Sequence, residues 1–243
     1  MRQTKTTQSS GWLTPPRLKR AELLDLGEGA ITDVAANLAE MSVINRFLGG
    51  ERALTSHLYP RLARLNRPAW LVDIGSGSAV LPHRILHWSH AQGIDLQVVA
   101  VDWSARVLSC AAHQTPPDPA FHFLQADALE LSFPFDGVDY LVSTLFLHHL
   151  APGEMVRMLR SAYHWARCGL VMSDLVRGWL PFLAFKLVQP VFARNYLTRH
   201  DGALSIRRAY TPQELLSLAQ QAGLRGARVH THFPWRMTLV VDK

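Results

Sequence analysis

Two groups of residues in the sequence are of types that could do chemistry. The first is the loop Asp73-Ile74-Gly75-Ser76-Gly77, in which small residues follow an acid. Glycine tolerates positive φ and has no Cβ, so such a loop lets the backbone approach a nucleotide-like ligand closely. The second is the histidine pair His148 and His149, with Asp174 further along the chain. Histidine titrates near neutral pH, so this pair suggests that a proton is removed from a substrate.

Each group follows a predicted strand. The apolar runs that predict strands are 71–74, 96–102, 121–125, 138–143 and 170–174. Their nearly continuous apolar character is typical of parallel strands that are buried on both faces. Ligands of open α/β sheets bind at the carboxyl ends of such strands, where Asp102, the histidine pair and Asp174 all lie. The sequence therefore predicts an α/β protein with its site at that edge.

Helical spacing of apolar residues predicts two helices before the first strand, from Ile31 to the stop at Gly49-Gly50 and then through Leu54–Leu65. Further helices are expected after the glycine loop and from Pro152. Thr211-Pro212-Gln213-Glu214 forms a capping box with proline at the first helical position, which indicates another helix start. Strands are expected over 225–232 and 235–240.

The segment Gly178–Leu197 is far more apolar than one helix face requires. Lys186 and Pro190 interrupt it, so it is not a membrane span. We expect it to wall a lipophilic pocket or to make a weak contact with a membrane surface, and a plain pair of core helices is the alternative.

The order of an acid followed by Gly-x-Gly-x-Ala over residues 73–79 resembles motif I of the class I S-adenosyl-L-methionine (SAM) methyltransferases. Ala79 stands where that motif has its last glycine, which we expect to trim space near the ligand. Val80 stands where the dinucleotide fingerprint needs its third glycine, which weighs against NAD or FAD. The histidine pair before Pro152 resembles the motif after the fourth strand of small-molecule methyltransferases. The resemblance covers roughly residues 31–240.

This resemblance implies a doubly wound, seven-stranded, mostly parallel sheet with an antiparallel ending, in one domain over residues 31–243. It also implies an N-terminal helical cap over 31–67 and a helical lid insertion over 178–210, between strands 5 and 6. Residues 1–30 are expected to form a disordered basic tail, because the first 21 residues contain no acid.

The same resemblance assigns the cofactor SAM to the glycine loop and to the strand ends. Asp102 would bind the ribose, Asp127 and Ala128 would lie on the adenine side, and Arg46, with Asn45 beside it, would hold the methionine carboxylate. The cofactor-binding residues are then Asp73, Gly75, Ser76, Gly77, Asp102, Trp103, Asp127, Ala128, Ser143 and Arg46. Alternatively, Asp102 prepares the N-cap of the next helix, Asp127 is a plain turn residue, and Arg46 is solvated.

His148 is the expected general base with Asp174 behind it, and His149 is a nearly equal choice. Alternatively, both histidines cap the next helix or line the pocket. The substrate residues are expected to be His200, Arg207, Tyr210 and Phe182, although the polar ones could equally tie down the lid. No metal site is predicted, since His83, His87 and His90 are interpreted as a solvated helix face.

The chain of 243 residues carries a formal charge of +6 and two cysteines, Cys110 and Cys168, without disulfide or metal spacing. With no signal segment, the expected location is the cytoplasm. We expect methyl transfer to a hydroxyl oxygen of a small lipophilic metabolite, such as a polyketide, phenolic or quinone-like compound of secondary metabolism. An RNA methyltransferase and a non-catalytic binding or scaffold protein are the alternatives. No nucleic-acid partner is expected, and the oligomeric state stays open.

Overall fold

One sheet organises the computed structural model, which describes residues 14–131, 133 and 137–243. Its seven strands lie in the order β3-β2-β1-β4-β5-β7-β6, and β7 runs antiparallel to both of its neighbours. The strands are β1 Ala69–Ile74, β2 Leu96–Asp102, β3 Phe121–Gln125, β4 Val138–Thr144, β5 Ala166–Leu175, β6 Arg228–His232 and β7 Arg236–Asp242. The predicted doubly wound, mostly parallel sheet with an antiparallel ending is confirmed.

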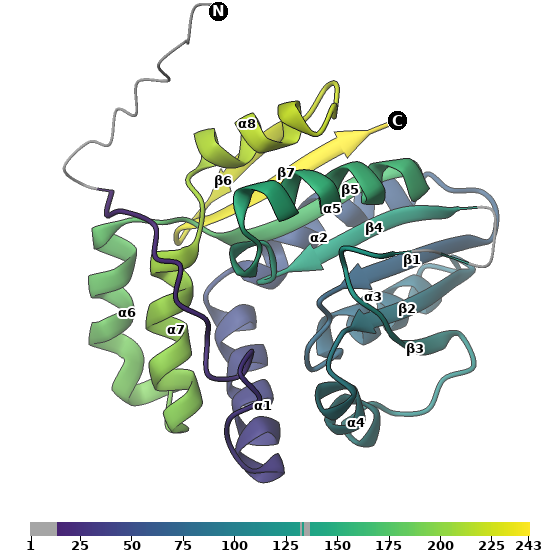
Figure 1. The fold of residues 1–243 in the computed structure, drawn as a ribbon. Helices are drawn as coiled ribbons and strands as arrows, with labels where there is room; N and C mark the ends of the chain where they lie inside the picture. The colour runs from purple at the N-terminus through teal and green to yellow at the C-terminus, as the bar shows by residue number, and fades with distance from the viewer. Residues whose placement is uncertain (1–13, 132, 134–136) are drawn as a thin grey trace, which may run out of the picture.

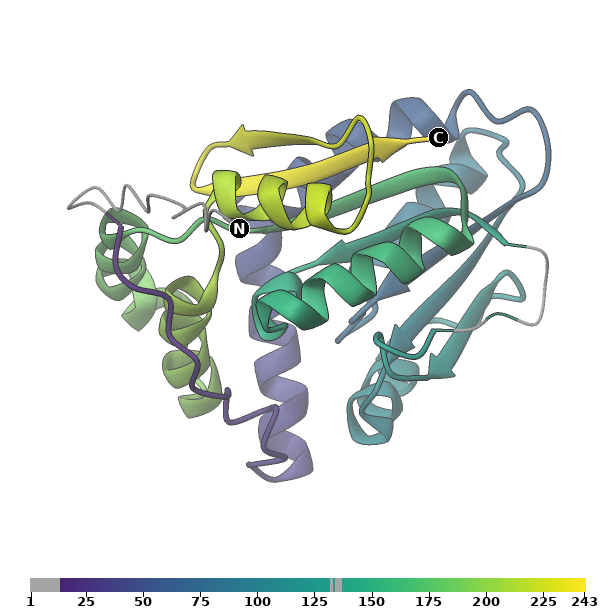
Figure 2. The ribbon, with the colours of Figure 1, turned by 45° about the horizontal axis from the view of Figure 1, so that its top comes forward.

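Helices cover both faces of this sheet (Figures 1 and 2). They are α1 Ile31–Phe47, α2 Gly50–Leu62, α3 Val80–Ala91, α4 Ala105–Gln114, α5 Pro152–Trp165, α6 Trp179–Phe192, α7 Tyr196–Arg208 and α8 Pro212–Gln221, with a short 3₁₀ helix, η1, at Leu147–His149. Side chains of α5 and α8 pack against one face of the sheet, and those of α2 and α3 pack against the other. The central strands are therefore buried on both sides, as their apolar runs predict.

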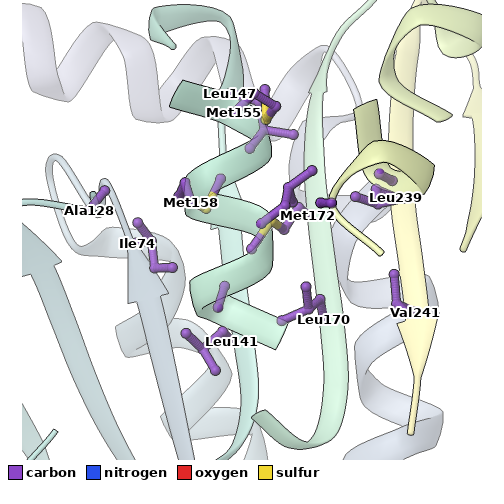
Figure 3. Packing of buried hydrophobic residues seen from close by; sticks show 14 of the residues in the cluster. Ile74, Ala128, Leu141, Leu147, Met155, Met158, Leu170, Met172, Leu239 and Val241 are labelled. Carbon is purple, nitrogen blue, oxygen red and sulfur yellow. The ribbon is translucent and has the colours of Figure 1, made fainter. Parts of the chain in front are cut away.

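The larger core lies between α5, α8 and the sheet. Figure 3 shows Met155 and Met158 of α5 beside Leu141, Leu170 and Met172 of the strands. These side chains are fully buried, so each contributes about 1.5 to 3 kcal/mol relative to an exposed position. This packing fixes the sheet whose carboxyl edge carries the loops of interest.

Beyond that edge, α1, α6 and α7 stand side by side (Figure 1). Ile44 of α1, Phe185 of α6, and Ala203 and Ile206 of α7 form a small apolar cluster of their own. Both the N-terminal helices and the helical insertion after β5 thus exist where the sequence places them. No described helix combines the length and the apolar character needed to cross a bilayer.

Residues 14–30 differ from the expected disordered tail, of which residues 1–13 lie outside the described part of the chain. Arg17 donates hydrogen bonds to the carbonyls of Arg208, His148 and Leu150. The backbone N–H groups of Leu23 and Leu24 donate to the carboxylate of Asp201 on α7. These polar contacts tie the segment across α7 and η1, which composition alone does not reveal.

The capping box at Thr211 is present as predicted: the hydroxyl accepts from the N–H of Glu214, and the Glu214 carboxylate accepts from the N–H of Thr211. We expect Thr211→Ala to lower the free energy of unfolding by about 1 kcal/mol, because one helix N–H loses its acceptor. Urea denaturation measures this. Ser217→Ala, on the same helix but outside the cap, should change stability by much less.

Candidate functional site

The glycine loop after β1 depends on backbone conformations that suit glycine. Gly75 has φ +69° and Gly77 has φ +53°. A Cβ on Gly75 would overlap the ring of Phe146, whereas one on Gly77 would meet only Leu38 at 3.8 Å. The N–H of Gly77 donates to Asp102 at 3.0 Å, so the loop is held directly against the end of β2. Both glycines therefore allow the close approach that the sequence predicts.

Ala79 behaves differently from the expectation that it trims space near the ligand. It has φ 55°, caps the N-terminus of α3 and is fully buried in the apolar cluster beneath that helix. It is not among the residues that line the neighbouring cavity. Its methyl group thus serves packing, and the departure from the usual glycine leaves the ligand side of the loop unchanged.

A cavity of about 650 Å³ opens at the carboxyl edge of the sheet. It extends from the glycine loop past the ends of β2 and β4 to η1, with α1 as one wall. The structure brings these predicted site residues to its surface: Asp73, Gly75, Ser76, Gly77, Asp102, Trp103, Asp127, Ala128, His148 and His149. Residues from separate strands thus meet in one space.

Buried acceptors without donors mark the end of the cavity near the glycine loop. Oδ1 of Asp73, Oδ1 of Asn45 and Oγ of Ser76 are buried and have no hydrogen-bond partner among the described residues. Burial, and then the charge of Asp102, raise the pKa of Asp73 to about 8. Buried polar atoms of this kind usually have partners, so these fit a ligand that brings donors or positive charge.

Asp102 ends β2 with both carboxylate oxygens in use. Oδ2 accepts from the N–H of Gly77 and Oδ1 from that of Ser104, each at 3.0 Å. Burial raises the pKa of Asp102, although the two N–H donors oppose the shift. A carboxylate oxygen has two lone pairs, so each can still accept a hydrogen bond from a ligand hydroxyl in the cavity.

His148 is buried between two carboxylates. Its Nδ1 lies 2.8 Å from Oδ1 of Asp174, and its Nε2 lies 3.4 Å from Oε1 of Glu22. Its backbone N–H also donates to Asp174, at 2.7 Å. Burial alone would lower the pKa of His148, but the two carboxylates outweigh it and raise that pKa to about 9. The predicted pairing of His148 with Asp174 is therefore present.

His149 lies beside it with its ring tilted by 35° and the ring centroids 4.3 Å apart. Its Nδ1 lies 2.9 Å from Oδ2 of Asp25, which also pairs with Arg208 at 3.1 Å. Its Nε2 faces Glu22, 3.8 Å from Oε2. The His149 side chain is 22% exposed and that of His148 3%, so His149 is the more accessible from the cavity.

A second cavity of about 130 Å³ adjoins the first. Its walls are almost entirely apolar and come from α1, α6, α7 and the ends of β4 and β5. The two cavities share Met41, Leu145, Leu175 and Ser205. An apolar slot thus leads away from the histidine pair beneath the inserted helices.

Residues 71–169 match a protein-family model described as a methyltransferase domain. That range contains the glycine loop, Asp102 and the histidine pair, all of which line the large cavity. This segment of the chain is therefore similar to a methyltransferase domain. The sequence resemblance implies SAM as the cofactor. No curated protein matches the chain in sequence.

Solved structures of methyltransferases share the fold. Human N-acetylserotonin methyltransferase in complex with SAM is 15% identical, with a TM-score of 0.61 over 93% of this chain and 63% of that one. The plantazolicin methyltransferase BpumL with SAH is 12% identical, with a TM-score of 0.62 over 88% and 97%. A SAM-dependent methyltransferase from Aquifex aeolicus is 14% identical, with a TM-score of 0.55 over 83% and 97%. The present chain thus spans about three fifths of the human enzyme's length.

Two predicted cofactor residues do not reach the cavity. Arg46 is exposed, and its guanidinium lies 5.9 Å from the centroid of the Phe47 ring. Its neighbour Asn45 is the residue that turns inward. Ser143 is fully buried and donates to the carbonyl of Ile74 at 2.7 Å, so it ties β4 to β1.

The four predicted substrate residues line neither cavity. Tyr210 donates to the carbonyl of Leu150 at 2.7 Å, and His200 pairs with Asp201 at 2.7 Å. The guanidinium of Arg207 lies 4.6 Å from the ring centroid of Trp179, and Phe182 packs against the cluster of α1, α6 and α7. Tyr210, Arg207 and Phe182 thus contact neighbouring elements, and His200 pairs within α7.

Other cavity residues are not predicted by the sequence. Glu22 and Asp25 lie within the expected tail, although they are the first acids after a long acid-free stretch. That change in composition was a usable signal. Arg84 of α3 also lines the cavity and pairs with Glu51 of α2 at 2.6 Å. Nothing in the local pattern distinguishes this arginine from a solvated one.

Proposed function

We propose that this methyltransferase transfers the methyl group of SAM to a hydroxyl oxygen of a small lipophilic acceptor. The observation that carries the proposal is that one cavity joins the glycine loop and Asp102 to the histidine pair, and that an apolar slot continues from it. A small acceptor is also consistent with the fold similarity to N-acetylserotonin methyltransferase. The cytoplasmic location and a role in secondary metabolism stay predictions.

The cavity residues fit SAM at the end with unpaired acceptors. Asp73 and Asn45 would hold the ammonium group, whose donors and charge suit their buried oxygens. Arg84, the one guanidinium among the residues that line this cavity, would hold the methionine carboxylate. Asp102 would accept from the ribose hydroxyls, and exposed Trp103 would cover the adenine side.

The acceptor would occupy the other end. Its apolar part fits the slot between α1, α6 and α7, and its hydroxyl would lie at the histidine pair. His149 is the better placed of the two to contact this hydroxyl, because it is more exposed to the cavity. His148, held by Asp174 and Glu22, positions its neighbour, and its predicted role as general base stays a prediction.

When bound, SAM supplies a methyl group that is activated by its sulfonium charge. The chain's task is then to align the acceptor oxygen with that methyl group and to exclude water. The glycine loop fixes one side of this alignment, and α1 and α7 close the other. The apolar walls of the slot keep water from the reacting end.

We expect Asp102→Ala to weaken binding of S-adenosylhomocysteine (SAH) by about ten- to a hundredfold. The expected loss is about 1 to 3 kcal/mol, because ligand hydroxyls lose a charged acceptor. Isothermal titration calorimetry on the full chain measures it. Asp95→Ala is the matched control, since Asp95 is exposed and precedes the opposite end of the same strand. Equal losses in both variants would argue against the ribose assignment.

Acceptor chemistry is tested by incubating the chain with SAM carrying a labelled methyl group and a set of phenols, polyketides and quinone precursors. Products that gain one labelled methyl on oxygen support the proposal. Labelled products methylated only on nitrogen or carbon, or labelling of RNA alone, would overturn it.

A further inference from the structure

Three side chains at the acceptor end of the cavity converge on one point. They are Glu22 of the N-terminal segment and His148 and His149 of η1, and one ligating atom from each lies within 4.8 Å of the others. Nε2 of His148 lies 3.4 Å from Oε1 of Glu22, and Nε2 of His149 lies 3.8 Å from Oε2. Charge-assisted hydrogen bonds are shorter, at about 2.7 to 2.9 Å. Two ligands of a tetrahedral Zn²⁺ ion, each about 2.0 to 2.1 Å from the metal, stand about 3.4 Å apart.

The far side of each imidazole is held by a carboxylate. Nδ1 of His148 lies 2.8 Å from Asp174, and Nδ1 of His149 lies 2.9 Å from Asp25. An ionised carboxylate only accepts, so each Nδ1 carries a proton, and Nε2 is the ring atom that remains to ligate a metal ion beside Glu22. Where Nε2 of His148 also carries a proton toward Glu22, a metal ion would displace that proton and take its place. A carboxylate behind each histidine is also the usual support of metal-bound histidines.

Glu22 itself is fixed in place. Its Oε1 accepts from Oγ of Ser205 at 2.8 Å, and the residue is 5% exposed. A metal ion binds more favourably to ligands that are already held at suitable separations. A solvated carboxylate would lose conformational entropy when it became ordered around the ion.

Charge also favours a cation at this point. Glu22, Asp25 and Asp174 bring three carboxylates together, and Arg208 is the one guanidinium that forms an ion pair with them in the described part of the chain. Once a metal ion has displaced the Nε2 proton of His148, both imidazoles are neutral and these groups carry two negative charges in a largely buried cluster. A divalent ion would balance them.

We propose that Glu22, His148 and His149 bind a divalent transition-metal ion, with Zn²⁺ as the best match to two imidazoles and one carboxylate. Asp174 and Asp25 hold the two histidines in the binding tautomer. Three protein ligands leave a position open toward the cavity, as in catalytic zinc sites. The acceptor's hydroxyl oxygen would take that position, a role that rests on the proposed function, whereas the metal site itself does not.

Co²⁺ is the probe for the test, because tetrahedral Co²⁺ with nitrogen and oxygen ligands absorbs visible light and replaces Zn²⁺ in such sites. The full chain is treated with a chelator, dialysed and titrated with Co²⁺, and Zn²⁺ is then added in competition. Nε2 of His57 lies 3.3 Å from Nε2 of His232 and could take up metal separately. All variants therefore carry His57→Gln and His232→Gln.

We expect one Co²⁺ per chain, displaced by one Zn²⁺. Glu22→Gln, which keeps the shape of the side chain, should weaken binding more than a hundredfold. Asp25→Asn, which changes only the support of His149, should weaken it about 10- to 100-fold. Lack of Co²⁺ binding, or equal binding by the parent and Glu22→Gln, would overturn the proposal.

SAH titration of the same samples separates this proposal from the proposed function and reports whether each variant is folded. Tight SAH binding without metal binding would overturn the metal site and leave the methyltransferase proposal standing. Metal binding without SAH binding would leave the metal site standing and overturn the proposed function. If Glu22→Gln fails to bind SAH, His149→Gln replaces it as the ligand variant.

Discussion

Asp174→Ala is expected to lower the free energy of unfolding by about 3 to 5 kcal/mol, the largest loss of stability among the substitutions considered. The carboxylate is 1% exposed and accepts from the backbone N–H groups of His148 and Leu175 and from Nδ1 of His148. Its removal leaves these buried donors without an acceptor. It also removes the negative charge that favours protonation of fully buried Arg236. Urea denaturation followed by circular dichroism measures the loss.

Asp174→Asn keeps the shape of the side chain and removes its charge, so it shows how much of the expected loss of stability is due to the charge. The amide oxygen can still accept from a backbone N–H, but its NH₂ group would face Nδ1 of His148. We expect a loss between that of the alanine variant and zero. If Asp174→Ala cost less than about 1 kcal/mol, the carboxylate could not be the main support of η1.

The sequence predicted the sheet well because its strands carry a strong local signal. The ends of β2 and β3 agree with the predicted ranges to the residue. Strand β5 begins at Ala166, four residues before the predicted start at Leu170. Residues 166–169 have little strand character, but Ala166 pairs with β4 and Gly169 pairs with both β4 and β7. The start of β5 is thus decided by pairing with neighbouring strands, which the local sequence pattern does not show.

The site was predictable where it depends on strand ends. Parallel strands bring their carboxyl ends to one edge, so Asp73, Asp102 and His148 had to meet once the topology was assumed. Site residues that do not lie at strand ends were not predictable. Glu22 and Asp25 reach the histidines through a segment without regular structure, fixed by the bonds of Arg17 and of Leu23 and Leu24.

The error at Arg46 concerns which side of α1 faces the cavity. The sequence offered Asn45 and Arg46 together, and adjacent residues on a helix point in directions about 100° apart, so only one of them could face the cavity. The cluster around Ile44 and Phe185 fixes the rotation of α1 that turns Asn45 inward. That rotation depends on packing against α6 and α7, elements that lie far away along the chain.

Asp73→Asn is expected to make the ligand-free protein more stable while weakening SAH binding by tenfold or more. Asp73 is fully buried without a partner for Oδ1, and burial raises its pKa to about 8. A raised carboxyl pKa means that the folded state binds a proton which the unfolded state has already lost. The free energy of unfolding therefore falls as pH rises from about 4 to 8, and at pH 8 the cost is on the order of a few kcal/mol.

In Asp73→Asn the free energy of unfolding should not show this fall with pH, since the amide does not titrate. In the unmodified chain, SAH binding at pH 7 should release close to one proton, because the ligand's ammonium group favours the ionised carboxylate. Calorimetry in buffers of different ionisation enthalpy measures that proton, and the variant should release none. Asp95→Asn is the control: it removes the same charge from an exposed position that does not line the cavity, so neither stability nor proton release should change. Undiminished SAH affinity in Asp73→Asn would mean that another group receives the ligand's positive charge, and Asn45, with its own unpaired oxygen, would be the next residue to replace.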